Sequence, residues 1–491
     1  MTKDTTRREF VQQTAALAGV AAAAGMVPAA TAGEAAELAY LSAIELAAKI
    51  RAKEISALEL TRFYIDRIER HDEKINAVVV RDFERALADA ETADAELSAG
   101  KPRGPLHGVP MTIKESYDIA GLPTTWGIPE GKDNIAKADS VVVQRFKAAG
   151  AHFMGKTNVP INLGDYQSYN AIYGTTNNPW DLGRTPGGSS GGSAATLAAG
   201  MAGLESGSDI GGSIRNPAHY CGVFGHKPTH GIVPARGHQP PGVPVGPGGV
   251  DLAVVGPLAR SAADLALAMD IVAGPDFLTA PGWRLELPPP RRTSFKGLRV
   301  ALWADDPMAP VEAEVAARVT TLGEQLAGLG ATVSDRARPE FSAKMSHETY
   351  LPLLTSVTGG PENELKHFDW QGLNGRRNYL RIQWQKFFQD WDVVVCPISA
   401  TAAFPQDESD IENRTLTING EQRPYFEQLF WAGLGIVSYL PSTVFPTGLS
   451  RSGLPIGLQA MGAEFDDRTT IEFARLVEEA FGGFTAPEGY A

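Results

Sequence analysis

The sequence predicts an α/β protein built around a largely buried sheet. Short apolar runs such as Val109–Ile113 and Val393–Cys396 alternate with segments in which apolar residues recur every three or four positions, such as Ser140–Ala149 and Pro310–Leu329. The first pattern is typical of buried strands and the second of amphipathic helices. The 491 residues are 43% hydrophobic and 21% charged, which is enough apolar material for a large core and excludes disordered and fibrous classes. Alternation of this kind indicates strands covered by helices.

The expected elements begin with a helical N-terminal part and continue as alternating strands and helices. We expect helices over Ser42–Lys53, Leu58–Arg70, Phe83–Leu97, Ser140–Ala149, Ser193–Gly200, Pro310–Leu329 and Thr469–Phe481. We expect strands over Val109–Ile113, Ala151–Gly155, Met201–Glu205, Leu298–Trp303, Val393–Cys396 and Leu454–Met461. The Pro/Gly-rich segment Gly237–Gly249 predicts an irregular surface loop, and a lid or a connector are the alternatives.

Charge and cysteine content narrow the classes of partner. The net charge of −13 repels phosphate backbones and anionic membranes, and no basic block offsets it locally, so nucleic acid is not an expected partner. Cys221 and Cys396 lie in apolar surroundings and are expected to be small buried hydrophobes. Two cysteines give no disulfide framework, and whether they pair stays open.

Residues 1–32 have the layout of a twin-arginine signal peptide. Arg7-Arg8 precede the weakly apolar stretch Ala15–Ala24, and Ala30-Thr31-Ala32 supply small residues for cleavage. A frayed helix or a membrane anchor is the alternative, but Ala and Gly are too weakly apolar to hold a span well. We therefore expect export to the periplasm or beyond, with no stable membrane insertion after cleavage.

The segment Pro186–Ala195, PGGSSGGSAA, has the composition of a flexible linker. It runs directly into Ser193–Gly200, where small and apolar residues have helical spacing, so it is better explained as a loop that enters a helix. Gly187–Gly191 also matches the G-x-S-x-G nucleophile turn of α/β-hydrolases. That turn needs a preceding strand, whereas Asp181–Pro186 is polar, and it needs a late histidine, whereas none follows His367.

Two further runs carry residues suited to catalysis. In Gly207–Pro217 two adjacent glycines precede Ser213, which lets backbone N–H groups converge as an oxyanion hole requires. A glycine turn with Ser213 as a helix N-cap is the alternative. In Leu106–Ser116, Lys114 lies at the end of an expected apolar strand. It is either a buried lysine whose pKa is lowered or an ordinary surface lysine.

Taken together, these motifs resemble the amidase signature hydrolases. The resemblance runs through the G-V-P-x-x-I-K motif that ends at Lys114, Gly155–Asn158, Asn178–Asp181, Pro186–Gly192, Asp209–Arg215 and Lys227–Thr229. It is close over residues 75–270 and loose over 40–490. It implies one amidase domain over residues 33–491, with an α/β/α fold around a large twisted mixed sheet.

The resemblance also implies roles for the site residues. Ser213 corresponds to the nucleophile, Ser189 to a bridging serine on a cis peptide, and Lys114 to the base. The N–H groups of Ile210, Gly211, Gly212 and Ser213 correspond to the oxyanion hole, while Ser190, Asp209 and Arg215 are expected to support the loops. A serine needs an adjacent base, and a lysine serves as one only when burial makes it neutral. No cofactor or metal is expected, and Pro228 between His226 and His230 disfavours a helix that would present both to an ion.

The implied activity is hydrolysis of the carbon–nitrogen bond of a small acyl amide through an acyl-enzyme. An aryl amide or a carbamate as substrate, esterase side activity and a homodimer stay open. The alternatives are the A subunit of a glutamyl-tRNA amidotransferase-type complex and a binding protein on a decayed enzyme scaffold. The stretch Val159–Tyr169 departs from many members of the family, which leaves specificity open. Five aromatic residues could line an apolar pocket or pack in the core: Trp126, Tyr166, Tyr169, Phe430 and Trp431.

Overall fold

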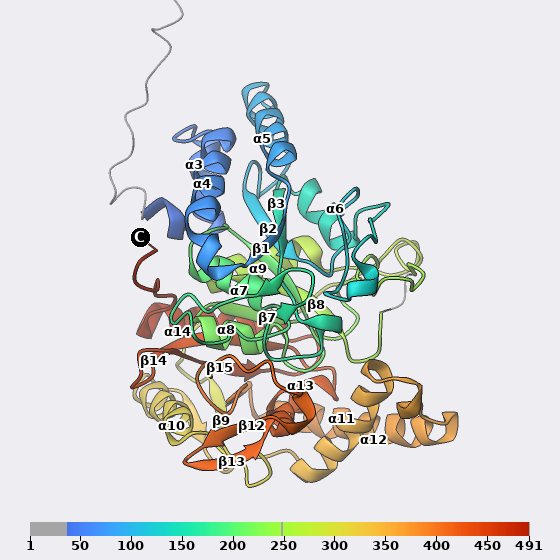
Figure 1. Cartoon of the computed structure of the whole chain (residues 1–491). Coiled ribbons are helices and arrows are strands. Elements are labelled where there is room, and N and C mark those ends of the chain that lie inside the picture. The colour runs from blue at the N-terminus through green and yellow to red at the C-terminus, as the bar shows by residue number, and fades with distance from the viewer. Residues whose placement is uncertain (1–36, 247–248, 491) are drawn as a thin grey trace, which may run out of the picture.

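The centre of the molecule is a mixed eight-stranded sheet (Figure 1). The computed structural model describes residues 37–246 and 249–490. In spatial order the strands are β10 (Thr332–Ser334), β9 (Arg299–Leu302), β11 (Val393–Cys396), β15 (Pro455–Met461), β14 (Ser442–Leu449), β7 (Phe224–Lys227), β8 (Val254–Ala259) and β6 (Glu205–Asp209). Two neighbouring pairs, β10 with β9 and β9 with β11, are parallel, and the other neighbours are antiparallel.

A second sheet of three strands stands next to the β6 edge of the first. Its order is β1 (Val78–Arg81), β3 (His152–Thr157) and β2 (Pro110–Lys114), and β2 packs beside β6. Every residue of β2 is buried, because the strand is covered on both faces. This contact brings the end of β2, where Lys114 stands, beside the end of β6, where Asp209 leads into the second glycine-rich loop.

Helices cover both sheets. Among the described residues the α-helices α3 to α14 are α3 (Ala43–Arg51), α4 (Ala57–Ile75), α5 (Phe83–Ser98), α6 (Val141–Ala148), α7 (Gly191–Ala198), α8 (Arg215–Cys221), α9 (Ala262–Val272), α10 (Ala313–Gly328), α11 (Ala343–Thr358), α12 (His367–Asp390), α13 (Leu429–Ile436) and α14 (Asp467–Phe481). The N-terminal helices α3, α4 and α5 lie together in blue at the top of Figure 1, and α11 and α12 project in orange at the lower right. Capping boxes fix the starts of α3 and α4, through Ser42 with Glu45 and Ser56 with Glu59.

The α/β class and the large mixed sheet are confirmed, but one predicted strand is wrong. The strand expected over Met201–Glu205 lies four residues later, over Glu205–Asp209. The apolar residues Met201 and Leu204 are buried in the turn after α7, whereas the strand itself reads Glu-Ser-Gly-Ser-Asp and carries buried polar side chains. Periodicity places strands by apolar residues, so it cannot find a strand whose side chains serve a polar site.

Several predictions concern segments outside regular structure. The signal peptide expected over residues 1–32 lies outside the described residues, so it stays a prediction, as does the single domain over 33–491. The described part of Gly237–Gly249 is a loop, and its His238 is buried. Cys221 and Cys396 are both buried and free, as expected of small hydrophobes. Among the described helices, none is long and apolar enough to cross a membrane.

Candidate active site

Lys114 is fully buried at the end of β2, and its amino group meets two serine hydroxyls. Nζ donates to Ser189 Oγ at 2.6 Å and to Ser208 Oγ at 3.0 Å. Ser189 lies in the first glycine-rich loop and Ser208 lies on β6, so the lysine joins that loop to the strand that leads into the second glycine-rich loop. Lys114 is therefore not a surface lysine, because its side chain has no exposed area.

The first glycine-rich loop leads straight into α7, as the sequence predicts, and its Gly188–Ser189 peptide is cis. Ser190 follows as the N-cap residue, and its N–H donates to the Ser213 carbonyl at 3.1 Å. The Ser190 hydroxyl also contacts the backbone of Ser208 at 3.4 Å. Ser190 therefore connects the loop of Ser189 to the loop of Ser213 and to β6.

A buried ion pair shapes the second loop. Arg215 donates to both carboxylate oxygens of Asp209 at 3.0 Å, and both side chains are fully buried. Asp209 also accepts from the backbone of Gly212 at 2.9 Å and of Ile214 at 3.1 Å. Burial opposes ionisation of Asp209, but the Arg215 guanidinium holds the pKa of this carboxyl below its usual value. Asp209 is thus the ionised centre around which the loop winds.

This arrangement corrects the expected oxyanion hole at one position. The N–H of Gly212 is already bound by Asp209, so Gly212 serves the loop by its left-handed backbone, at a φ of +102°, and not as a free donor. Within the described residues the N–H groups of Ile210, Gly211 and Ser213 have no protein acceptor. These three remain available to an oxyanion.

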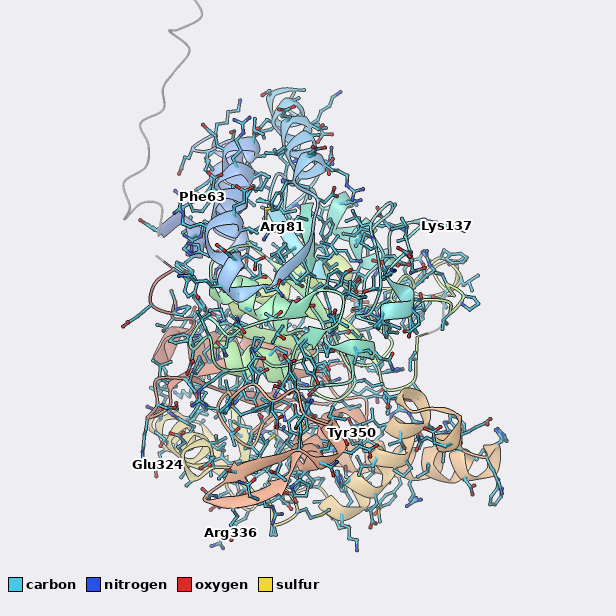
Figure 2. The ribbon with its side chains drawn as sticks, in the orientation of Figure 1. Phe63, Arg81, Lys137, Glu324, Arg336 and Tyr350 are labelled. Carbon is cyan, nitrogen blue, oxygen red and sulfur yellow. The ribbon has the colours of Figure 1, made fainter. Side chains whose placement is uncertain are left out.

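Two buried tyrosines hold the carbonyls of the same loop from behind. Tyr166 donates to the Gly211 carbonyl at 2.6 Å, and Tyr350 donates to the Ile210 carbonyl at 2.8 Å. Tyr350 comes from α11 and is labelled in Figure 2, where it lies inside the C-terminal half of the molecule. Because a peptide's carbonyl and the following N–H point in opposite directions, these bonds help to fix where the N–H groups of Gly211 and Gly212 are aimed.

Two cavities meet at Ser213. The first, called here the triad cavity, has a volume of about 160 Å³ and is lined by Ser189, Ser208 and Ser213 together with Trp126 and His238. The second, called here the strap cavity, has about 350 Å³. Both include Ser213 and Ile210 in their walls. The strap cavity is otherwise lined by Leu163, Gly164, Asp165, Tyr166, Gly211, Leu351, Leu354, Thr355, Thr358, Phe426 and Leu429.

Burial lowers the pKa of Lys114 to about 7, although the nearby charges of Asp209 and Glu205 oppose the shift. Two other buried lysines have similarly lowered pKa values, about 8 for Lys156 and about 7 for Lys227. Their partners differ, because Lys227 donates to the Pro228 carbonyl and Lys156 to Thr124 and the Pro123 carbonyl. Only Lys114 of these three meets serine hydroxyls that lie in a cavity wall.

Sequence reasoning missed Ser208, Glu205 and His238. Glu205 accepts from Thr112 at 2.6 Å and is fully buried, and burial raises the pKa of its carboxyl to about 8. His238 meets Ser116 at 2.9 Å, and burial lowers the pKa of its imidazole to about 3, so it is neutral at ordinary pH. The polar run Glu205–Asp209 could have pointed to Ser208 and Glu205, because buried polar residues in a strand need hydrogen-bond partners.

The remaining candidates divide between the cavities and the core. Trp126 and Tyr166 line the triad and strap cavities, whereas Phe430 and Trp431 belong to the hydrophobic core. Tyr169 meets Arg414 through its hydroxyl. In the described ranges no cluster of three or more His, Cys, Asp or Glu residues could hold a metal ion.

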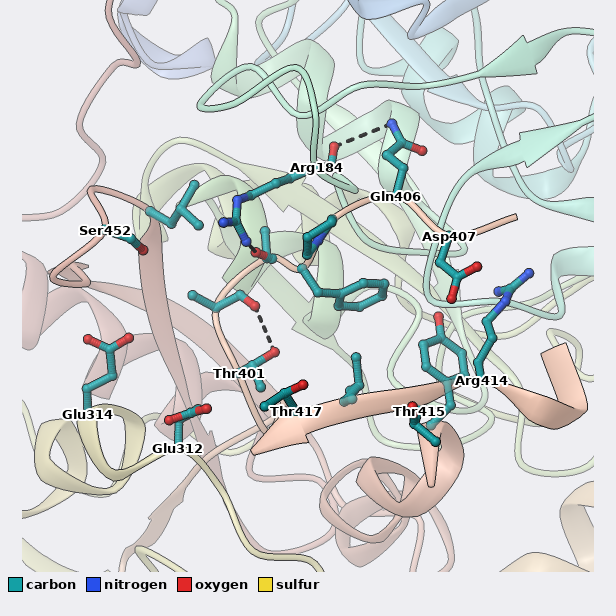
Figure 3. A pocket seen from close by; sticks show the side chains of 17 residues that line it. Arg184, Glu312, Glu314, Thr401, Gln406, Asp407, Arg414, Thr415, Thr417 and Ser452 are labelled. Atoms are coloured by element: carbon teal, nitrogen blue, oxygen red, sulfur yellow. Dashed lines mark hydrogen bonds between the residues drawn. The ribbon is translucent and has the colours of Figure 1, made fainter. Parts of the chain in front are cut away.

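A third cavity, called here the hairpin cavity, lies away from the catalytic candidates. It has a volume of about 500 Å³ and lies beside the hairpin of β12 (Thr415–Ile418) and β13 (Glu421–Pro424) (Figure 3). None of the candidate catalytic residues lines its wall. Size alone therefore does not identify the active site of this protein.

Comparison with known proteins identifies the relatives of this chain. The family model described as Amidase matches residues 59–362 and 341–471. An acylamidase of Rhodococcus erythropolis is 33% identical, and the match covers 89% of this chain and 94% of the relative. The glutamyl-tRNA(Gln) amidotransferase of Moorella thermoacetica has an A subunit that is 32% identical, with coverage of 90% and 97%. The structure of a bacterial aryl acylamidase of the amidase signature family superposes with a TM-score of 0.77 at 25% identity, covering 90% and 96%.

The fold, the site and these relatives define an enzyme class, the hydrolases that act on the carbon–nitrogen bonds of amides. Within that class the chain belongs to the amidase signature family.

Proposed function

We propose that this enzyme hydrolyses small, uncharged acyl amides with apolar groups, aryl amides among them, with Ser213 as nucleophile, Ser189 as proton relay and Lys114 as base. The observation that carries the proposal is the 2.6 Å hydrogen bond between the buried Lys114 amino group and Ser189, in a cavity whose wall also contains Ser213. A neutral lysine in this position can take a proton that a hydroxyl releases.

In the proposed reaction Ser213 Oγ attacks the carbonyl carbon, its proton passes to Ser189, and the Ser189 proton passes to Lys114. The carbonyl oxygen becomes an oxyanion held by the N–H groups of Ile210, Gly211 and Ser213, and one such donor contributes about 3–4 kcal/mol in known cases. The proton then returns through Ser189 to the amide nitrogen, the carbon–nitrogen bond breaks, and the amine leaves. Water attacks the resulting ester of Ser213 with the same base, which releases the acid and restores the serine.

The walls of the two cavities support uncharged substrates. No Lys or Arg lines the described wall of either cavity, and their carboxylates, Asp209 and Asp165, are paired with Arg215 and Arg414. A charged substrate group would therefore be desolvated without a counter-ion. The relatives named acylamidase and aryl acylamidase favour acyl and aryl amides. Esters are expected as side substrates, because a better leaving group needs less help from the returned proton.

The A subunit of an amidotransferase is the alternative that the 32% identical relative supports. A site that takes an amide from a free amino acid would need to accommodate its charged ends. The described walls of the triad and strap cavities offer no cation for a carboxylate, which favours a stand-alone acyl amidase.

The test is turnover of an acyl-anilide series by the purified full chain, beside Ser213→Ala and the control Ser98→Ala, which changes an exposed serine at the end of α5. We expect the wild type and the control to release aniline and Ser213→Ala to lose at least about a thousandfold in kcat, as nucleophile removal does. Retained turnover in Ser213→Ala would contradict the proposal.

We also propose export through the twin-arginine route, supported by Arg7-Arg8 and the Ala-rich stretch after them. Changing both arginines to lysine should leave full-length precursor in the cytoplasm. The matched control changes Arg62 and Arg70, both exposed on α4, to lysine and should leave export unaffected. Mature protein in the periplasm from the Arg7→Lys/Arg8→Lys variant would contradict the proposal.

A further inference from the structure

Residues 165–168, called here the strap, connect the two loops of the active site. Tyr166 donates to the Gly211 carbonyl at 2.6 Å, and Ser168 Oγ donates to the Gly187 carbonyl at 3.0 Å. The Gly191 N–H donates to the same Ser168 oxygen at 3.1 Å. The strap therefore has hydrogen bonds to the loop of Ser189 and to the loop of Ser213 at once, and Asp165 and Tyr166 also line the strap cavity.

The strap is held from its far side by an ion pair. Arg414 Nη1 donates to Asp165 Oδ2 at 2.5 Å, and the Tyr425 hydroxyl donates to Asp165 Oδ1 at 2.6 Å. Arg414 also donates to the Ser409 carbonyl and to the Tyr169 hydroxyl. Asp165, Arg414 and Tyr425 are 7%, 4% and 2% exposed. We call these three residues the clamp.

The clamp lies between two cavities. Asp165 belongs to the wall of the strap cavity, whereas Arg414 and Tyr425 belong to the wall of the hairpin cavity drawn in Figure 3, where Arg414 stands near Asp407. The residue after Tyr425, Phe426, lines the strap cavity with Tyr166, and the centres of the two rings are 6.3 Å apart. The clamp thus joins one wall of the strap cavity, formed by Asp165 and Tyr166, to another, formed by Phe426 and Leu429.

A buried ion pair adds little net stability to the contact between two cavity walls. Desolvation of both charges offsets most of their attraction, and well-packed apolar residues would serve as well or better. What the pair adds is direction, because the carboxylate must meet the guanidinium on one oxygen and the tyrosine hydroxyl on the other. The width of the strap cavity is then fixed by hydrogen-bond geometry and not by packing alone.

We propose that the Asp165–Arg414–Tyr425 clamp determines substrate selectivity by fixing the width of the strap cavity, and that it positions the Gly211 segment through Tyr166. The inference rests on the proposed function, because it assigns a selectivity to that same site. The clamp residues are positioning residues, since their hydrogen bonds within the described chain reach none of Ser213, Ser189 and Lys114.

The experiment compares wild type with Tyr425→Phe and Asp165→Asn, each of which removes one hydrogen-bonding function with little change in volume. Two substrate series are used, one with a lengthening acyl chain on a fixed aniline and one with a growing aryl amine on a fixed acetyl group. Active sites are counted by titration with a fluorophosphonate, so that kcat and kcat/KM are calculated per folded site. The control is Asp392→Asn, which removes the charge of a buried carboxylate that pairs with the partly exposed Arg299 at the start of β9.

In one of the two series the variable group fills the strap cavity. Along that series we expect the clamp variants to change the ratio of kcat/KM between the smallest and the largest member by about tenfold or more relative to wild type. This factor corresponds to the loss of one charge-assisted hydrogen bond. The other series should fall uniformly, and Asp392→Asn should leave both ratios unchanged. Parallel loss in both series, or unchanged ratios in both clamp variants, would overturn the inference. A wild type inactive on every amide would instead overturn the proposed function, so the two failures are distinguishable.

Discussion

Lys114 Nζ and Ser189 Oγ lie 2.6 Å apart although their residues are 75 positions apart in the chain and belong to different elements. The contact exists because β2 of the small sheet packs beside β6 of the large one, which places the end of β2 under the loop that enters α7. The lysine has no exposed area there, and burial lowers its pKa to about 7. A base that is partly neutral at physiological pH is thereby placed against a hydroxyl.

The pH profile tests the state of Lys114. The protonated lysine cannot accept a proton, so kcat/KM for a neutral anilide should rise about tenfold per pH unit below pH 7 and level off above it. Glu205 titrates in the same range, since burial raises its pKa to about 8, so Glu205→Gln is the control. The rising limb should persist in Glu205→Gln and vanish in Lys114→Ala. A wild-type profile that is flat between pH 5 and 8 would contradict the role of Lys114.

Lys114→Ala should also separate amides from esters. An amine leaves only when it receives the returned proton, whereas a good alkoxide or phenoxide leaves without it. The ratio of kcat/KM for a matched anilide and phenyl ester should therefore fall by about a hundredfold or more in Lys114→Ala, within the range known for proton transfer by a positioned group. An unchanged ratio would mean that Lys114 only supports the loop.

The motifs of the site could be predicted from the sequence because glycine and serine runs are visible without the fold. Short motifs fix local structure, so Lys114 could be expected at the end of a strand and Ser189 in a loop that enters a helix, whereas their catalytic roles stay predictions. Gly212 differs, because its N–H belongs to Asp209, three residues earlier, and no spacing rule shows which donor a buried carboxylate will take. The clamp was beyond sequence reasoning as well, since Asp165 and Arg414 are 249 positions apart and their pairing depends on tertiary structure alone.

Position 188 must be glycine, because the backbone of the strap lies too close to leave room for a Cβ atom. A Cβ at this position would lie 2.3 Å from the Asp165 carbonyl oxygen and 2.5 Å from that of Gln167, and both are backbone atoms that cannot turn away. Gly188→Ala should therefore destabilise the fold by about 2 kcal/mol or more, as overpacking does, and abolish turnover. Gly372→Ala is the control, because a Cβ there meets nothing within 4 Å in the helix α12. Thermal unfolding of both variants measures the difference, and equal midpoints would contradict the steric argument.

The Asp209–Arg215 pair should be important for stability as well as for the loop. Asp209→Asn leaves the buried guanidinium of Arg215 without its counter-ion, which costs about 3–5 kcal/mol in known buried pairs. Glu54→Gln breaks an exposed pair with Lys49 and should cost less than about 1 kcal/mol. Denaturant unfolding of the two variants checks the contrast. If Asp209→Asn were no less stable than Glu54→Gln, the pair would not be the centre of the loop.

The most direct test is to find which serine acts as the nucleophile toward a fluorophosphonate, which transfers its phosphonyl group to the attacking oxygen and releases fluoride. The full chain is treated with a fluorophosphonate, digested, and mapped by mass spectrometry, with Ser213→Ala and Ser189→Ala treated in parallel. We predict a single adduct on Ser213 in the wild type, none in Ser213→Ala, and slow labelling of Ser213 in Ser189→Ala, because the relay to Lys114 is interrupted. An adduct on Ser189 in the wild type would contradict the assignment of nucleophile and relay.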